Sequence, residues 1–281
     1  MTPSIIDKLL ERAFEEDLSG GDLTTEACVL PDARAKATAV ARKPLVVCGG
    51  AVFLRAFTLL DPEVETRVHV ADGAAVEKDA VIWEVTGRAR SLLMAERTAL
   101  NFAQRMSGIA TTARAYTGAL APGSRTRIVD TRKTTPGLRV LERYAVRTGG
   151  AHNHRDNLGS AVMIKDNHII AAGGIAQAVE RARARAPHTS RIELEVANLA
   201  ELEQAITAKA DIIMLDNFTT EDTVKAIARV NELPVRPIIE SSGGITMTRI
   251  RELSEAGVDV ISVGALTHSA PAADIALDLV L

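Results

Sequence analysis

Cationic side chains and histidines are dense in the segment between Asp130 and His168. They are Arg132, Lys133, Arg139, Arg143, Arg147, His152, His154, Arg155, Lys165 and His168. The whole chain has a formal net charge of -3, so this positive charge is local. A local cluster predicts a pocket for a small polyanion, because a nucleic-acid surface would spread its positive charge more widely. For Arg139, Arg143 and Arg147, which are spaced i, i+4, a solvated helix face is the favoured interpretation.

Short apolar runs precede these ionisable groups and continue beyond them. The runs cover residues 126 to 129, 161 to 164, 191 to 196, 211 to 215, 235 to 239 and 258 to 263, and helical patterns separate them. Such alternation is typical of a parallel α/β architecture. Polar residues or glycine lie at or just beyond the ends of the runs, at Asp130, Lys165, Glu195, Asp216, Glu240 and Gly264. The carboxyl ends of barrel strands converge on one mouth, so this placement predicts a β/α barrel with its active site there.

Two carboxylates of one run, Glu193 and Glu195, are two residues apart and therefore lie on one face of a strand. If that face is the interior, both need a cation, since an unpaired buried charge is very costly. Oxygen ligands, here Glu193, Glu195, Asp216 and Glu240, indicate Mg²⁺, which uses one or two carboxylates together with substrate phosphates and water. The two cysteines, Cys28 and Cys48, lack metal-ligand spacing and are interpreted as buried or incidental thiols.

Two glycine-containing loops follow the last two runs. Residues 240 to 245 join a strand to the helical pattern of residues 246 to 256, and residues 263 to 268 repeat this arrangement. Backbone amides at a helix N-terminus and the helix dipole both favour anions. Paired loops of this kind after the last strands of a barrel predict a bound phosphate.

The first third of the chain has a different pattern. An amphipathic helix begins at Thr2 and Pro3, and β-like runs follow at residues 36 to 41, 64 to 70 and 80 to 85. A helical stretch over residues 89 to 117 comes next, with a break expected near Ser107 and Gly108.

These patterns predict an α/β protein with two domains. We expect an α+β sandwich domain over residues 1 to 110. A TIM-like β/α barrel, complete or incomplete, is expected over residues 111 to 269. The tail at residues 270 to 281 is expected to pack on the first domain.

Composition excludes several classes of protein. The chain of 281 residues has 47% hydrophobic and 25% charged residues, which are globular values. Its apolar runs are shorter than the ~18 to 20 residues that cross a bilayer, and its acidic amphipathic start is unlike a signal peptide. Aromatic residues make up 3%, which leaves few side chains for base stacking. We therefore expect a cytoplasmic protein without nucleic-acid or membrane partners.

Six motifs stand in order along the chain. They are Asp130-Thr131-Arg132-Lys133-Thr134, Asn153-His154-Arg155, Ile164-Lys165-Asp166-Asn167-His168, Leu215-Asp216-Asn217-Phe218, Glu240-Ser241-Ser242-Gly243-Gly244 and Val263-Gly264-Ala265-Leu266-Thr267-His268. The N-terminal half adds Glu16-Asp17, Gly21-Asp22-Leu23-Thr24-Thr25, Glu96-Arg97-Thr98, Leu100-Asn101 and Ser107-Gly108-Ile109-Ala110-Thr111. This set resembles the quinolinate phosphoribosyltransferases, which are type II phosphoribosyltransferases, over nearly the whole chain. Six ordered motifs are far more specific than any one of them.

The resemblance implies a reaction and its partners. Quinolinate and phosphoribosyl pyrophosphate would give nicotinate mononucleotide, pyrophosphate and carbon dioxide, with Mg²⁺, in de novo NAD biosynthesis. The pyridine nitrogen would attack the anomeric carbon of the ribose as pyrophosphate leaves, and the protein would act mainly by positioning and electrostatics. Decarboxylation would follow on the alkylated ring.

The resemblance also implies a role for each matched residue. The dicarboxylate pocket comprises Arg132, His154, Arg155 and Lys165, with Arg97 supplied by the neighbouring subunit of a homodimer or a higher oligomer. Phosphoribosyl pyrophosphate and its metal are held by Lys133, Glu195 and Asp216, and the 5′-phosphate by Ser242, Gly243, Gly264 and His268. The catalytic set is Lys133, Lys165, Glu195 and Asp216, of which Glu195 and Asp216 are the metal ligands.

The substrate loop departs from the family pattern at two positions. Ala151 stands where a third glycine is usual, and Asp156 follows Arg155 where an apolar residue is usual. An acid beside Arg155 could pair with it and weaken its hold on a substrate.

Three alternatives stay open at this point. A phosphate-binding barrel aldolase would use Lys165 or Lys133 as a Schiff-base nucleophile. A paralogous phosphoribosyltransferase for another heterocycle would lack part of the dicarboxylate pocket. A non-catalytic sensor of a phosphorylated metabolite would keep the glycine loops without needing the carboxylates.

Overall fold

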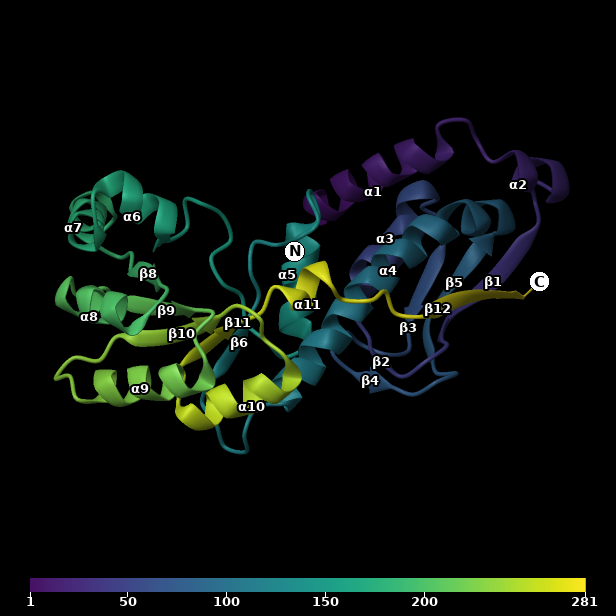
Figure 1. Ribbon diagram of the computed structural model, residues 1–281. Helices are drawn as coiled ribbons and strands as arrows, with labels where there is room; N and C mark the ends of the chain where they lie inside the picture. The colour runs from purple at the N-terminus through teal and green to yellow at the C-terminus, as the bar shows by residue number, and fades with distance from the viewer. Residues whose placement is uncertain (281) are drawn as a thin grey trace. The chain divides into compact units, whose positions relative to one another are not determined.

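The computed structural model describes residues 1–280, which form two compact units (Figure 1). One unit combines Met1–Arg114, Thr134–Gly150 and the C-terminal segment from Leu266. The other combines Ala115–Lys133 and Ala151–Ala265. The domain boundary expected between residues 110 and 111 stays a prediction.

An antiparallel sheet forms the centre of the first unit. Its strands lie in the order β12 (Ile275–Val280), β1 (Arg34–Ala41), β5 (Val81–Arg88) and β3 (Glu65–Val68). A smaller ladder joins β2 (Leu45–Val46) to β4 (Ala75–Val76). The helices of this unit are α1 (Pro3–Leu18), α2 (Leu23–Cys28), α3 (Gly50–Leu60), α5 (Arg139–Thr148) and most of α4 (Ala89–Gly118).

Aromatic side chains fill the space between α3 and the sheet. Phe53 stacks on Trp83 of β5 with a centroid distance of 4.7 Å, and Phe57 meets Phe53 edge-on at 5.2 Å. All three are fully buried. Aromatic pairs at these separations contribute about 0.5 to 1.5 kcal/mol beyond their burial. The expected α+β N-terminal domain is thus confirmed, with helix and sheet as its two layers.

Helix α4 is continuous from Ala89 to Gly118, so the break expected near Ser107 and Gly108 was wrong. The Ser107 hydroxyl instead accepts from the Cys48 N–H and donates to the Cys48 carbonyl, at 3.0 Å each. A Cβ at Gly108 would lie 1.9 Å from the Pro271 carbonyl oxygen. Glycine is therefore present because another backbone segment passes close to the helix, and the helix continues through it.

A six-stranded parallel sheet forms the second unit. Its order is β6 (Arg127–Val129), β11 (Val260–Ser262), β10 (Ile238–Ser242), β9 (Ile212–Asp216), β8 (Ile192–Val196) and β7 (Val162–Ile164). The helices between these strands are α6 (Asp166–Ala172), α7 (Ile175–Arg185), α8 (Leu199–Thr207), α9 (Thr220–Asn231) and α10 (Met247–Ala256), and α11 (Ala265–His268) follows the last strand (Figure 1). All six predicted strands are present, and the ends of each lie at most three residues from the predicted limits.

Strand alternation sorts the side chains of this sheet. Leu194, Ile213, Ile239 and Ile261 are fully buried on the face that the helices cover. The opposite face carries Glu193, Glu195, Met214, Asp216, Glu240 and Ser242, which the parallel register brings side by side. The helix-covered face therefore supplies the core, and the other face collects the ionisable groups.

The sheet is an open form of the expected TIM-like barrel. Strands β6 and β7 are its two ends and do not pair with each other among residues 1–280. A single parallel bridge joins Val129 to His152 beyond the edge at β6. Within those same residues no helix is both long and apolar enough to span a bilayer.

Candidate active site

The predicted site residues of the second unit gather at the carboxyl ends of its parallel strands. Asp130 follows β6, Lys165 follows β7, Glu195 lies in β8, Asp216 and Ser242 end β9 and β10, and Gly264 follows β11. Parallel strands bring these ends to one edge of the sheet. The placement inferred from the apolar runs is therefore confirmed for these residues.

The first ionic contact at this edge joins Lys165 to Glu195. The Lys165 Nζ lies 2.5 Å from the Glu195 Oε2, and the carboxylate side chain is 16% exposed. The backbone N–H of Lys165 donates to the His168 Nδ1 at 3.0 Å, which ties the lysine to the first turn of α6. One of the two inward carboxylates of β8 thus has the cation that its position requires.

The second inward carboxylate belongs to a buried cluster of three ionisable groups. The His154 Nε2 lies 3.3 Å from the Glu193 Oε1 and 3.4 Å from the Glu240 Oε1. Glu193 and Glu240 are each 3% exposed. Among residues 1–280, the buried Glu240 Oε1 accepts no well-aligned hydrogen bond. The His154 imidazole, at 3.4 Å, is the group that offsets its buried negative charge.

This cluster binds a proton more tightly than its separate groups would. Burial opposes the charged imidazole, but hydrogen bonds and the charges of Glu240 and Glu193 raise the pKa of His154 to about 10. Burial and the neighbouring Glu240 charge also raise the pKa of Glu193. In the neutral ring the His154 Nδ1 accepts the Arg155 N–H at 2.7 Å and the proton lies on Nε2, between the two carboxylates. The additional proton of the charged ring binds Nδ1 and displaces that hydrogen bond.

A buried aspartate holds the loop that carries His154. Asp130 is fully buried and accepts hydrogen bonds from the Asn153 side chain at 2.6 Å and the His154 N–H at 2.7 Å. Arg155 extends from the same loop and donates to the Ala161 carbonyl at 3.1 Å. Asp130 therefore fixes the loop from the end of the neighbouring strand.

Two guanidinium groups occupy the same region of the edge. Burial and the nearby positive charge of Arg132 lower the pKa of Arg155. Arg132 is exposed, and its side chain makes no hydrogen bond or ion pair within the described chain. Two guanidinium groups that repel each other at a sheet edge form a site that an anion with two carboxylates would stabilise.

The glycine loop after β10 is built for close backbone approach. Gly243 and Gly244 have φ values of +87° and +54°, and a Cβ at Gly243 would lie 2.1 Å from the Asn217 Oδ1. The Asn217 N–H donates to the Ser242 carbonyl at 2.9 Å, and Arg249 donates to the Gly243 carbonyl at 2.9 Å. Helix α10 begins at Met247, and its N-cap Thr246 accepts from the Arg249 N–H at 3.3 Å. A glycine loop followed by a helix N-terminus is the arrangement on which the phosphate site was predicted.

Two sets of residues could hold a metal ion. Oxygen or nitrogen atoms of His154, Glu193 and Glu240 all lie within 4.8 Å of one another, but the ring proton on Nε2 occupies the position a metal would need. Asp216 accepts only from the Asn217 side chain, at 2.9 Å, and pairs with no cation among residues 1–280. A carboxylate without a cation at the sheet edge, beside Glu195, fits the predicted Mg²⁺ ligands better.

Arg97 and His268 belong to the other compact unit, and their part in the site stays a prediction. Arg97 lies on α4, is exposed, and has no hydrogen bond or ion pair from its side chain within the described residues. Arg105 on the same helix is different, because it donates to Glu142 at 2.8 Å and to the Ala270 carbonyl at 3.0 Å. Only Arg97 of this pair keeps its guanidinium available for another molecule.

Three residues that contribute to the site were not among the predicted site residues. Asp130 and Glu240 were interpreted as residues at strand ends, and Glu193 as a carboxylate on the same strand face as Glu195. The signal for Glu193 was its alternation with Glu195, whereas nothing in the sequence joined Glu240 to His154. That contact depends on the order in which the strands pair.

Comparison with known proteins decides the family. The sequence models of the quinolinate phosphoribosyl transferase N-terminal and C-terminal domains match residues 22–107 and 109–278. The chain belongs to the quinolinate phosphoribosyltransferase family. It is 43% identical over 276 residues to the probable nicotinate-nucleotide pyrophosphorylase [carboxylating] of Bacillus subtilis, which covers 98% of this chain and 94% of that protein.

Other relatives of the quinolinate phosphoribosyltransferase family agree. The protein of the same name from Synechocystis is 43% identical, over 98% of this chain and 93% of its own. The crystal structure of NadC from Streptococcus pyogenes superposes with a TM-score of 0.94 at 43% identity, covering 100% of this chain and 98% of that one. The expected family and fold class are therefore confirmed.

The two departures from the family pattern have local explanations. Ala151 is 4% exposed and precedes the bridge at His152, so its small side chain is buried. The Asp156 N–H donates to the Ser160 Oγ at 3.0 Å, and its carboxylate accepts from the Asn157 side chain at 3.4 Å. Ala151 therefore lies ahead of the loop that carries His154, and Asp156 belongs to the turn that leads from Arg155 to β7.

Proposed function

We propose that this chain transfers the phosphoribosyl group of phosphoribosyl pyrophosphate to quinolinate and releases pyrophosphate and carbon dioxide. The product would be nicotinate mononucleotide, and the cell would use it in de novo NAD biosynthesis. The observation that carries the proposal is the sheet edge itself, where Arg132, Arg155, His154 and Lys165 accompany the carboxylates Glu195 and Asp216 in a chain of this family. Both substrates are polyanions, and this edge provides guanidinium, ammonium and amide donors for them.

Quinolinate binding follows from the chemistry of the donors. Its two adjacent carboxylates match the two guanidinium groups of Arg132 and Arg155, each of which can form paired hydrogen bonds. His154, held between two carboxylates, keeps its ring in one orientation beside them. Binding a dianion here relieves the repulsion between the two guanidinium groups, so the dicarboxylate is selected over a monocarboxylate.

The transfer step needs positioning and charge stabilisation. The pyridine nitrogen displaces pyrophosphate at the anomeric carbon through a transition state with oxocarbenium character. Lys133 lies in the loop after β6 and neutralises charge that develops on the pyrophosphate oxygens. Glu195 and Asp216 would hold either Mg²⁺ or the ribose hydroxyls. A bound Mg²⁺ would supply further neutralisation of the charge on the leaving group.

The aldolase alternative fits the site less well. A Schiff-base lysine must be a neutral amine when it attacks a carbonyl. The Lys165 Nζ instead lies 2.5 Å from the Glu195 Oε2, so it is engaged in an ion pair and not directed at a carbonyl. An ammonium in this position serves as an anion ligand.

The experiment that tests the proposal is a reaction with defined substrates. The purified chain, incubated with quinolinate, phosphoribosyl pyrophosphate and Mg²⁺, should form nicotinate mononucleotide and carbon dioxide in equal amounts. Nicotinate should not replace quinolinate, because the missing carboxylate leaves a cation unmatched. Equal turnover of the two pyridines would disprove the dicarboxylate pocket, and no turnover of either would disprove the activity.

The proposal includes a cytoplasmic homodimer with shared active sites. The support is Arg97, whose guanidinium makes no hydrogen bond or ion pair within the described chain, whereas Arg105 donates to Glu142 and to the Ala270 carbonyl. A twofold dimer gives two equivalent sites, each with Arg97 from one chain and Lys165 from the other.

Mixing two inactive variants tests the shared site. Arg97→Ala and Lys165→Ala proteins, dissociated and reassociated in equal amounts, should regain activity, since half the dimers are mixed and about a quarter of all sites are intact. Heterodimers without activity, confirmed by native mass spectrometry, would place Arg97 in its own chain's site or outside any site.

A further inference from the structure

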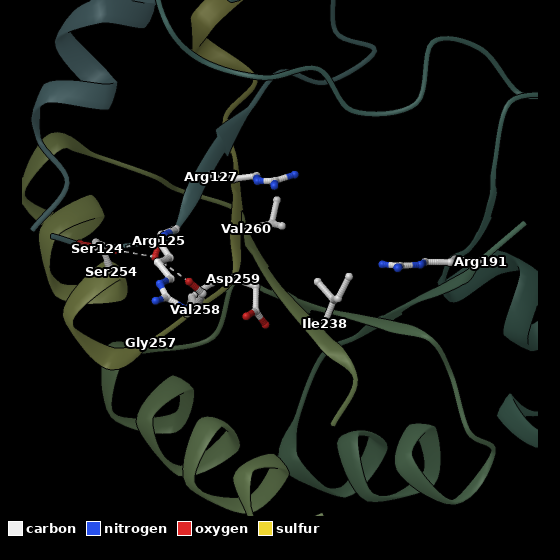
Figure 2. A pocket seen from close by; sticks show the side chains of 11 residues that line it. Ser124, Arg125, Arg127, Arg191, Ile238, Ser254, Gly257, Val258, Asp259 and Val260 are labelled. Carbon is white, nitrogen blue, oxygen red and sulfur yellow. Dashed lines mark hydrogen bonds between the residues drawn. The ribbon is translucent and has the colours of Figure 1, made fainter. Parts of the chain in front are cut away.

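A second concave region lies at the amino ends of the same parallel strands. It has a volume of about 530 Å³. Its walls include Arg127, Ile238 and Val260, the first residues of β6, β10 and β11, and Arg191, which directly precedes β8 (Figure 2). The predicted site residues Lys165, Asp216, Ser242 and Gly264 lie at the other ends of the sheet strands, and the lining of the cavity includes no residue of the candidate active site. The cavity is therefore separate from that site, although one sheet forms both.

The charge of the cavity is positive and uncompensated. Arg125, Arg127 and Arg191 line it, are exposed, and have side chains without a hydrogen bond or ion pair in the described part of the chain. The acidic residue of the wall is Asp259, whose Oδ2 already accepts from the Arg236 Nη1 at 2.6 Å and the Ile239 N–H at 2.7 Å. Arg236 thus neutralises Asp259, and the three lining guanidinium groups have no counter-charge in the cavity.

Two of these side chains are directed at each other. Figure 2 shows Arg127 and Arg191 extending from opposite sides of the opening, with Val260 and Ile238 between them. The register places Arg127 beside Val260 on the same face of the sheet, so the arginine stands over an aliphatic floor. Facing guanidinium groups repel, and an anion between them removes the repulsion and can hydrogen-bond both.

We propose that this cavity binds a small molecule with at least two negative charges, carried by phosphate or carboxylate groups, between Arg127 and Arg191. Guanidinium forks suit both groups, because each presents two parallel N–H donors to two oxygens. The volume is within the range of about 300 to 1,000 Å³ that is usual for small-molecule sites. Arg125 adds a third positive charge at the rim. The proposal does not depend on the catalytic function.

Calorimetric titration of the full chain with pyrophosphate and with citrate tests the proposal. The two probes separate a phosphate ligand from a carboxylate ligand. The test variant is Arg127→Gln/Arg191→Gln. Its matched control is Arg181→Gln/Arg185→Gln, which removes two exposed charges from α7 of the same unit. The candidate active site also attracts anions, so the number of sites is measured as well as the affinity.

For at least one of the two probes, the native chain and the control should differ from the cavity variant in one of two ways. They should bind one more molecule of probe per chain, or they should bind the probe in the cavity at least tenfold more tightly. Arg191→Glu, which reverses one charge, should give the same loss alone. Transfer activity should be unchanged in the cavity variant, which shows that it is folded. Equal stoichiometry and affinity in the native chain, the control and the cavity variant for both probes would overturn the proposal.

Discussion

The two ends of the parallel sheet use positive charge in different ways. At the carboxyl end, Lys165 pairs with Glu195, and His154 lies between two buried carboxylates. At the amino end, Arg127 and Arg191 are exposed and have no partner within residues 1–280. A paired cation is held in place before any ligand arrives, whereas an unpaired one is free to reorient. Ion pairs therefore preorganise the cations at the carboxyl end of the sheet, where we propose that the reaction occurs. At the amino end, a bound anion would have to supply the missing partner of the arginines.

Removing the paired lysine should have the largest effect. Lys165→Ala deletes an anion ligand and leaves Glu195 without its cation, so kcat/KM for quinolinate should fall about 10³-fold, or about 4 kcal/mol. Steady-state kinetics measure this. The control is Lys225→Ala, which breaks exposed pairs with Glu221 and Asp222 and should leave kcat/KM within a factor of two. Equal kinetics for both variants would mean that the Lys165 pair is only structural.

The buried cluster should show the next largest effect, on stability. His154→Leu removes the donor between Glu193 and Glu240, and the free energy of unfolding should fall by about 3 kcal/mol, because two buried carboxylates lose their compensation. Urea unfolding at pH 7 measures the change. Glu203→Gln, which breaks an exposed pair with Arg229, should cost at most about 0.5 kcal/mol. A loss below 1 kcal/mol for His154→Leu would show that water compensates the carboxylates.

The same cluster predicts a pH dependence. The pKa of His154 in the folded chain is raised from 6.5 to about 10, and that of Glu193 is also raised, so the folded state binds more protons than the unfolded state. The stability from His154 is complete below pH 6.5 and is lost as the pH rises toward about 10. The free energy of unfolding should therefore fall steadily over that window.

Urea unfolding at intervals across this pH window checks the prediction, with His154→Gln as the comparison. The variant should have a flatter profile, because its side chain does not titrate. If the native chain and the variant lose stability equally, the slope comes from other groups and the cluster holds no extra proton.

The unpaired arginines should show the smallest effect on stability. Arg127→Gln/Arg191→Gln should change the free energy of unfolding by at most about 0.5 kcal/mol, with a gain as the expected sign, because repulsion is removed and no contact is lost. Thermal unfolding in low salt measures it. Arg236→Gln is the matched control, since it breaks the bond to Asp259 at 2.6 Å and should cost about 1 kcal/mol. A larger loss in the double variant than in the control would show that these arginines are structural.

The sequence predicted the carboxyl end of the sheet well and the amino end poorly. Apolar runs located every parallel strand, so Lys165, Asp216 and Gly264 fell at strand ends by counting alone. The apolar runs do not reveal the order in which the strands pair in the sheet. The contact of His154 with Glu240 depends on that order. Arg127 and Arg191 carried no signal either, because a charged residue that opens a strand is ordinary in sequence and gains meaning only when two such residues face each other.

Ser107 and Gly108 illustrate a different limit. A Ser-Gly pair is a common helix terminator, and the local pattern predicted a break there. The pair is required by contacts that are remote in sequence, with Cys48 for the serine and Pro271 for the glycine. These tertiary contacts outweighed the local tendency to end the helix, and a pattern in one sequence does not reveal such contacts.

The last strand of the first unit has a consequence for how the molecule is made. Strand β12 pairs with β1 along its whole length, from Ala41 with Ile275 to Lys36 with Val280. During translation, β12 is synthesised after every strand of the second unit. Until then, the backbone amides and carbonyls of β1 that face β12 in the folded chain have no strand partner. Such an open edge recruits other chains, and long-range pairing of this kind is slow. The period of greatest aggregation risk is therefore during translation, when chaperone binding would protect that edge.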